Sequence, residues 1–399
     1  MHHAAEILSS LFIVFVAAQI GAEVAQRIRL PGVVGEIVAG CAIGPAALGW
    51  LSSAQIAAGT PLDALSEIGV VLLLFSVGLE TRIDDLKRVG RSALLVGVLG
   101  VLLPFALGAL WAHGAGFAWT KSLFVAAAFV ATSAGITARV LQELGVLSRI
   151  ESRVILGAAV IDDILAMLLL GVVTSLQAGS GVDFGSLAFV LSQAIGFVAL
   201  FGWVGTRVMR ERTHWIDRPI NPLSPLMISL AICLGLAFLS TQFGLAAIIG
   251  AFLAGMIASE THRREELEHQ TSPLLAFLTP FFFVITGAKI DIGVFASATA
   301  LWMLLVVTII AIASKLVGGF LGALSLGRRS ATIVGVGMVP RGEVGVVIAS
   351  LGLASGVFSG EIYAVIVAMS LLTSVVTPPV LAALLRRDRQ EDPAPSSPS

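Results

Sequence analysis

GAAVIDDI, residues 157–164, places two adjacent aspartates, Asp162 and Asp163, inside a long apolar run. The run predicts a helix over 150–176, with the aspartates about twelve residues, or roughly 18 Å, from its basic end. That depth is near the middle of a bilayer core that is roughly 30 Å thick. An isolated charge there costs at least about 2.5–3.5 kcal/mol on insertion scales, so these carboxylates must pair, take up protons or lie in water.

The composition of the whole chain is that of a membrane protein. Of its 399 residues 57% are hydrophobic and 12% charged, whereas soluble domains have about 25% charged residues. Apolar runs near 20 residues recur from end to end, so we expect an all-α fold embedded in a lipid bilayer. The thirteen predicted transmembrane helices are 6–26, 33–51, 62–80, 92–113, 120–144, 150–176, 184–208, 223–242, 245–260, 272–288, 294–326, 330–355 and 360–385. The polar, Pro- and Ser-rich residues 386–399 are predicted to form a disordered cytoplasmic tail.

The basic residues predict the orientation of the chain. With these spans, 20 of the 24 Lys and Arg residues lie on one side, and only Lys121 and Lys289 lie on the other. Because basic loops stay in the cytoplasm, we expect the N-terminus outside and the C-terminus inside, in a bacterial cytoplasmic (inner) membrane.

Two predicted helices share a glycine motif. Residues 33–40, VVGEIVAG, and 248–255, IIGAFLAG, follow the same pattern of two apolar residues, Gly, three residues, Ala and Gly. The second copy lies seven helices after the first, an odd offset, so the two would have opposite orientations, as in the inverted-topology repeats of secondary transporters. The alternative is that both motifs serve only helix packing, for which small residues are common in membranes.

Further polar residues lie near the centres of three other predicted spans. They are Thr132, Ser133 and Gly135 in 120–144, Lys315 in 294–326, and Pro340, Arg341, Gly342 and Glu343 in 330–355. Glycine favours a break in the span 120–144 at Gly135, and proline and glycine favour one in the span 330–355 at Pro340 and Gly342. Carbonyls and hydroxyls freed at such breaks can complete an oxygen shell around a small cation, and charged residues can offset the half-helix dipoles.

These residues predict ion and proton exchange. Two neighbouring carboxylates cannot both ionise cheaply, so a cation and protons would compete for Asp162 and Asp163. We assign ion and proton binding to these aspartates, with Thr132 and Ser133, and charge compensation to a second set, Lys315, Arg341 and Glu343.

Several alternatives stay open. Asp162 and Lys315 could form a purely structural ion pair, Arg341 and Glu343 could only neutralise a helix break, and Thr132 and Ser133 could form an ordinary polar packing face. The role of Glu36 is also open, with a structural one favoured.

Other functions find less support in the sequence. The six histidines lie at the N-terminus or in predicted loops, and Cys41 and Cys233 lie in apolar runs. We therefore expect no enzyme activity, no nucleic-acid partner, and no cofactor besides the transported Na⁺ and H⁺. An ion channel would need a filter-like loop or a ring of like charges, and a carrier of organic solutes would need a further polar cluster.

Five stretches carry a family resemblance. They are LPGVVGEIVAG (30–40), ATSAGITARVLQELG (131–145), GAAVIDDI (157–164), SKLVGGFLGA (314–323) and GMVPRGEVG (337–345). Together they resemble the bacterial sodium/proton antiporters of the NapA type, in the monovalent cation:proton antiporter superfamily. The likeness extends from the first predicted span to the last.

The resemblance implies a thirteen-helix NhaA/NapA-like antiporter fold with crossed discontinuous helices. Residues 91–180 and 293–385 would form the core ion-transport domain, and residues 1–90 and 211–292 the dimerisation domain, joined by the linker helix at 181–210. The protein would be a homodimer with elevator-type alternating access.

In the same family pattern, Asp163 would be the principal carrier of ions and protons, and Asp162 would pair with Lys315 when no ion is bound. An Asp-Asp pair with a lysine implies electrogenic exchange of Na⁺, or Li⁺, for H⁺ in pH and sodium homeostasis. The alternative is a K⁺/H⁺ antiporter of the same superfamily.

Overall fold

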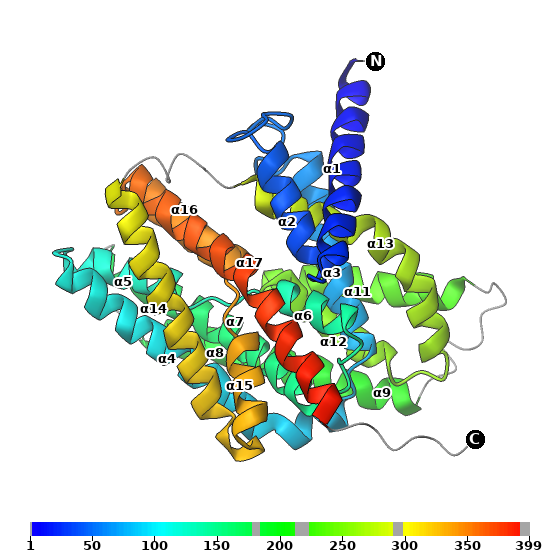
Figure 1. Ribbon diagram of the computed structural model, residues 1–399. Helices are drawn as coiled ribbons and strands as arrows, with labels where there is room; N and C mark the ends of the chain where they lie inside the picture. Colours follow the sequence, from blue (N-terminus) through cyan, green and yellow to red (C-terminus); the bar gives the residue numbers. More distant parts are fainter. Residues whose placement is uncertain (1, 178–183, 212–222, 290–297, 392–399) are drawn as a thin grey trace.

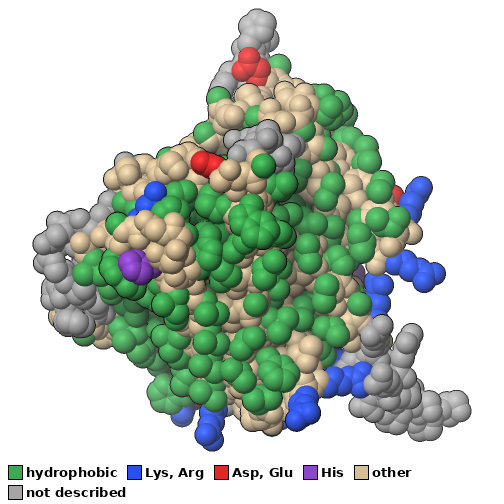
Figure 2. Space-filling model, turned by 60° about the vertical axis from the view of Figure 1, so that its left-hand side comes forward, with side chains coloured by type: hydrophobic (Ala, Val, Ile, Leu, Met, Phe, Trp, Pro, Cys, Tyr) green, Lys and Arg blue, Asp and Glu red, His purple; other side chains and the backbone are tan. Residues whose placement is uncertain are grey.

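The computed structural model of the chain describes residues 2–177, 184–211, 223–289 and 298–391, and these contain helices but no strand. Nine of the helices in these ranges are long and apolar enough to cross a bilayer, and α2 and α12 are shorter apolar helices. Figure 2 shows hydrophobic side chains covering the broad middle of one face, with Lys and Arg gathered at its edges. The protein is therefore an integral, multi-pass membrane protein.

Helix occurs within each of the thirteen predicted segments. In chain order the helices are α1 (His2–Arg27), α2 (Gly32–Ile43), α3 (Pro61–Leu79), α4 (Ile83–Gly114), α5 (Trp119–Ala128), α6 (Ala134–Glu143), α7 (Ile150–Gln177), α8 (Phe184–Ala199), the π-helix η1 (Leu200–Gly205), α9 (Thr206–Glu211), α11 (Ser224–Gln242), α12 (Ala247–Ala258), α13 (Arg264–Ala288), α14 (Ala298–Gly322), the 3₁₀ helix η3 (Leu324–Leu326), α15 (Arg328–Gly337), α16 (Glu343–Ala354) and α17 (Gly360–Glu391). The count of thirteen membrane spans stays a prediction.

Two of the predicted helices are interrupted near their centres (Figure 1). The segment 120–144 divides into α5 and α6, and the segment 330–355 divides into α15 and α16. The two gaps meet, because the N–H of Ser133 donates a 2.8 Å hydrogen bond to the carbonyl of Pro340. Proline has no N–H to continue a helix, and this bond uses a carbonyl that the break leaves without a helical partner.

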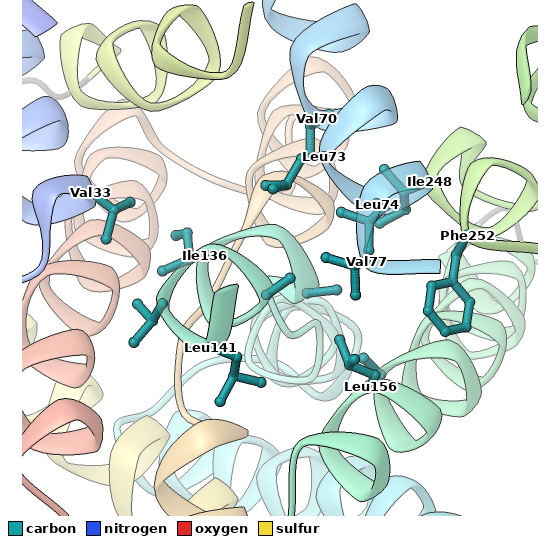
Figure 3. Close-up of a cluster of buried hydrophobic side chains, with 14 of the residues drawn as sticks. Val33, Val70, Leu73, Leu74, Val77, Ile136, Leu141, Leu156, Ile248 and Phe252 are labelled. Atoms are coloured by element: carbon teal, nitrogen blue, oxygen red, sulfur yellow. The ribbon is translucent and has the colours of Figure 1, made fainter. Parts of the chain in front are cut away.

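The helices pack as two groups. In the first group α1, α2, α3, α11, α12 and α13 contact one another, and in the second α4, α5, α7, α14, α15, α16 and α17 do so. Short α6 lies between the groups, in contact with α2 and α3 on one side and with α7 and α17 on the other. Figure 3 shows the apolar packing around it, with Ile136 of α6 on the side of Val33 of α2, and side chains of α3, α7 and α12 on the opposite side of α6. The assignment of these groups to dimerisation and transport domains stays a prediction.

The two glycine motifs make matching helix contacts. A Cβ atom at Gly40 of α2 would overlap the carbonyl of Val284 in α13, and one at Gly255 of α12 would overlap the carbonyl of Phe75 in α3. Only glycine permits this backbone approach. The second glycine of each motif therefore fixes how α2 packs on α13 and how α12 packs on α3.

Candidate functional site

A buried ion pair lies at the centre of the site. Lys315 of α14 donates a hydrogen bond from Nζ to Oδ1 of Asp162 in α7, and both side chains are 0% exposed. Helix α4 closes over the pair, since a Cβ atom at Gly100 would lie 3.4 Å from the lysine Nζ. Each charge supplies the counter-charge that the other needs in an interior away from water.

The other oxygen of Asp162 binds the first helix break. Its Oδ2 accepts a 3.0 Å hydrogen bond from the backbone N–H of Thr132. Bonds from N–H groups to a carboxylate are among the stronger hydrogen bonds in proteins. Asp162 therefore joins α7, α14 and the gap between α5 and α6.

The two breaks pack tightly where they cross. Gly342 faces Ser133 so closely that a Cβ atom on the glycine would lie 2.7 Å from the serine Cβ. One turn into α6, Thr137 donates from Oγ1 to the carbonyl of Gly337, at 2.8 Å. Gly135 instead faces α3, where an added Cβ would lie 3.0 Å from Val70 Cγ2. These contacts fix the position of the non-helical segments of the two breaks relative to each other.

Arg341 lies at the crossing with its guanidinium fully buried. Its Nη1 donates to the carbonyl of Val130 at 3.0 Å, and its Nη2 donates to the carbonyl of Ala311 in α14 at 2.9 Å. The carbonyl end of a helix carries a partial negative charge. The Arg341 guanidinium, which belongs to the break between α15 and α16, therefore offsets the partial negative charge at the end of α5, in the other break. Glu343 begins α16, and its side chain lies outside the described part of the chain.

Asp163 faces a different neighbourhood from Asp162. Consecutive residues of an α-helix point about 100° apart, because a turn takes 3.6 residues. Asp163 is buried, and it lines a small cavity whose other walls are apolar: Leu74, Ala134, Leu156, Ala159, Val160, Ile248, Ile249 and Phe252. Since Leu74 belongs to α3 and Phe252 to α12, this aspartate lies on the seam between the two helix groups.

Two hydroxyls at the first break have no hydrogen-bond partner among the groups that the structure describes. They are Thr132 Oγ1 and Ser133 Oγ, and both are buried. A buried polar atom without a partner costs about 1–3 kcal/mol, so each such atom calls for an explanation. Hard cations prefer oxygen ligands, and these hydroxyls follow directly on the carbonyls at the end of α5. The described residues contain no cluster of three or more His, Cys, Asp or Glu residues that could hold a metal ion. A cation bound at this place would therefore rely on hydroxyl and carbonyl oxygens beside the aspartates.

Comparison with known proteins identifies the family. The model of the sodium/hydrogen exchanger transmembrane family matches residues 11–387. This chain belongs to the sodium/hydrogen exchanger family. It is accordingly a cation/H⁺ antiporter, and the ion pair and crossed breaks described above lie within the matched region of this exchanger.

Several relatives match this exchanger along nearly its whole length. The high-affinity Na⁺/H⁺ antiporter NhaS3 of Synechocystis is 36% identical, over 99% of this chain and 93% of that protein. The Na⁺/H⁺-K⁺ antiporter GerN of Bacillus cereus is 35% identical, over 94% and 95%. The solved structure of the sodium proton antiporter MjNhaP1 of Methanocaldococcus jannaschii has a TM-score of 0.67 at 17% identity, covering 97% of each chain, and shows the same fold. The narrower NapA-type assignment stays a prediction.

Sequence reasoning missed one set of polar residues that reaches the break in this exchanger. Thr373 and Ser374 of α17 both bond to the backbone of Arg341. A signal was present, because the hydroxyl residues 370, 373, 374 and 377 have the spacing of a single helix face. Hydroxyls in helices often bond only to their own backbone, however, so the spacing alone does not reveal a cross-helix partner.

Proposed function

We propose that this exchanger moves Na⁺, and also Li⁺, against H⁺, with Asp162 and Asp163 as the ion- and proton-carrying groups. One observation carries the proposal. Beside a fully buried Asp162–Lys315 pair, the hydroxyls of Thr132 and Ser133 are buried with no partner in the described part of the chain. A small cation would satisfy both oxygens and would take over the role of counter-charge to the carboxylate.

The exchange of charge follows from this competition. Without a cation, the ammonium of Lys315 neutralises Asp162. A cation that binds among the carboxylates and hydroxyls removes the need for the protons on Lys315 and Asp163. If more than one proton is released for each Na⁺, net charge moves in every cycle, so we propose that transport is electrogenic.

We further propose that the site moves by an elevator-type mechanism within a homodimer of the NapA type. Asp163 faces an apolar wall formed by α3 and α12, and a hydrated ion would not cross such a wall unaided. Movement of the second helix group against this wall would carry the site from one side to the other. The matching glycine contacts and the pair of crossed breaks support an inverted repeat, on which such movement is based in secondary transporters. In this proposal the protein has thirteen spans in a bacterial cytoplasmic membrane, with its N-terminus outside.

The relatives support Na⁺ as the first candidate and K⁺ as the second. NhaS3 is named for Na⁺/H⁺ exchange alone. GerN is named for both Na⁺ and K⁺, and the K⁺/H⁺ antiporter subunit KhtU of Bacillus subtilis is 28% identical over 89% of this chain. Potassium is also a monovalent cation that binds oxygen ligands, so a K⁺/H⁺ antiporter is the alternative.

A cation series on the purified protein in liposomes tests the proposal. With a pH-sensitive dye inside, Na⁺ and Li⁺ should each move protons, and the rate should respond to an imposed membrane potential. Asp163→Asn should abolish the signal, whereas Asp84→Asn, the same change at an exposed position of α4, should retain it. A response to K⁺ alone would select the alternative function, and full activity of Asp163→Asn would remove this residue from the mechanism.

A further inference from the structure

The break between α15 and α16 is held by a neighbouring helix as well as by its own sequence. The N–H of Arg341 donates a 3.2 Å hydrogen bond to Oγ1 of Thr373, and the carbonyl of Arg341 lies 2.8 Å from the donating Oγ of Ser374. Both hydroxyls belong to α17 and are at most 1% exposed. Adjacent residues of α17 thus bind the N–H and the carbonyl of one residue in the gap.

The chemistry of each hydroxyl fits its place. Thr373 donates its proton to the carbonyl of Ser370 at 2.8 Å, which leaves its oxygen lone pairs to accept the Arg341 N–H. Ser374 lies 2.8 Å from the carbonyls of both Ser370 and Arg341 and donates its single proton to one of them at a time. Backbone groups deep in a membrane have no water to bond with, so a break needs such substitutes.

The orientation of the Arg341 guanidinium depends on this backbone. The side chain reaches from the gap to the carbonyls of Val130 and Ala311, and the neighbouring carbonyl of Pro340 receives the N–H of Ser133. A shift of the Arg341 backbone would therefore displace both the guanidinium at the end of α5 and Ser133, whose hydroxyl belongs to the proposed cation site.

We propose that Thr373 and Ser374 are positioning residues for the cation site, acting through the backbone of Arg341. They set where the guanidinium and the Pro340 carbonyl lie, and thereby the geometry of the oxygens offered to the cation at Thr132 and Ser133. Neither residue touches the transported ion. The inference rests on the proposed cation site, and it adds the requirement that α17 shapes that site.

The same helix supplies matched controls. Among the described residues, Thr377 donates only to the carbonyl of Thr373, at 2.7 Å, and Ser370 only to that of Ile366, at 3.0 Å. These two residues are at most 3% exposed, and these bonds stay within α17. Thr373→Val and Thr377→Val are therefore the same chemical change on the same helix, with and without a bond to the break. Ser374→Ala and Ser370→Ala form a second such pair.

The test is the apparent KM for Na⁺ in proteoliposomes, measured beside the maximal rate and the thermal stability. Thr373→Val should raise KM about fivefold or more, the ratio that corresponds to the loss of one net hydrogen bond. Thr377→Val should change it by less than about twofold, because the net loss of a bond within α17 does not reach the site. Thr373→Ser keeps the accepting oxygen and should restore the wild-type value. In the same way, Ser374→Ala should raise the apparent KM for Na⁺ more than Ser370→Ala does.

Equal KM values for Thr373→Val and Thr377→Val would overturn the proposal, as would a failure of Thr373→Ser to restore the value. If Thr373→Val does not fold, the serine pair decides by the same comparison. Absence of cation-driven proton movement in the wild-type protein would instead overturn the proposed function, so the two failures are distinct.

Discussion

Removing the charge of Lys315 should destabilise the protein more than removing any half-exposed cation. Lys315 and Asp162 are both 0% exposed, and the amine is hydrogen-bonded to Oδ1 of the aspartate. Lys315→Met would leave a buried carboxylate without its counter-charge. Breaking a buried pair from one side costs about 3–5 kcal/mol, mostly because the remaining charge stays buried.

A second change should recover most of this loss. In the double variant Asp162→Asn/Lys315→Met neither member of the ion pair carries a charge, and the asparagine carbonyl can still accept the N–H of Thr132, which lies 3.0 Å from Asp162 Oδ2 in the wild type. Replacing a buried ion pair by neutral groups is often neutral or stabilising. The double variant should therefore be within about 1 kcal/mol of the wild type, at most about a third of the loss in the single variant.

Unfolding in mild detergent at neutral pH measures these differences. Lys289→Met is the control, because Lys289 is 40% exposed and pairs with Asp63 at 3.1 Å, and such pairs contribute about 1 kcal/mol at most. The reasoning is refuted if Lys315→Met is no less stable than Lys289→Met. It is also refuted if the double variant is as unstable as Lys315→Met.

Three further predictions concern the packing and the surface of the protein. Gly40→Ala should lower the free energy of unfolding by about 1–3 kcal/mol through overpacking, since its Cβ would overlap a backbone carbonyl of α13. Gly90→Ala is the control, because an added Cβ there has no atom within 4 Å. This control should be neutral or stabilising in the same thermal unfolding experiment. Glu143→Ala removes the carboxylate that accepts the first N–H of α2 at 3.0 Å and should cost about 0.5–2 kcal/mol, with faster hydrogen exchange confined to the start of α2 as the signature. Glu80 follows the last residue of the α3 span, and burial and the charge of Glu268 raise its pKa. The wild type should therefore lose stability as the pH rises from the ordinary glutamate value through that raised pKa, while Glu80→Gln should not; melting curves that keep a constant separation at every pH would contradict this.

Part of the site could be predicted because charge in lipid is costly. The need of a buried lysine for a counter-charge predicts a carboxylate partner for Lys315, and the family resemblance implies that this partner is Asp162; the structure brings the two together. The break between α15 and α16 follows from local chemistry as well, since Pro340 has no N–H and Gly342 weakens a helix. The other break does not lie at Gly135 as predicted, because this glycine is the second residue of α6.

The partners of Arg341 could not be predicted in the same way. Its guanidinium binds backbone carbonyls of Val130 and Ala311, and every residue has a carbonyl, so the acceptor leaves no mark on the sequence. The cavity beside Asp163 is similar, because its walls are ordinary apolar residues of four helices. Contacts between helices far apart in the chain decide both features.

Helix boundaries differ where hydropathy and helix formation diverge. We predicted a start at residue 272 for the helix that begins at Arg264 in the structure. Hydropathy marks only the apolar part of this helix, whereas its polar first turns are stabilised by pairs such as Arg264 with Glu268, 2.6 Å apart and four residues along. Conversely, α2 ends at Ile43 and not at residue 51, because Gly44 and Pro45 interrupt a segment that remains apolar.

The central claim is that a cation and protons compete for the same buried carboxylates. Its most direct test is the release of protons when Na⁺ is added to the purified protein in weakly buffered detergent solution. The wild type should release protons in proportion to the Na⁺ bound, and Asp163→Asn should release fewer or none. Tight Na⁺ binding without proton release, or equal release from Asp163→Asn, would contradict the account.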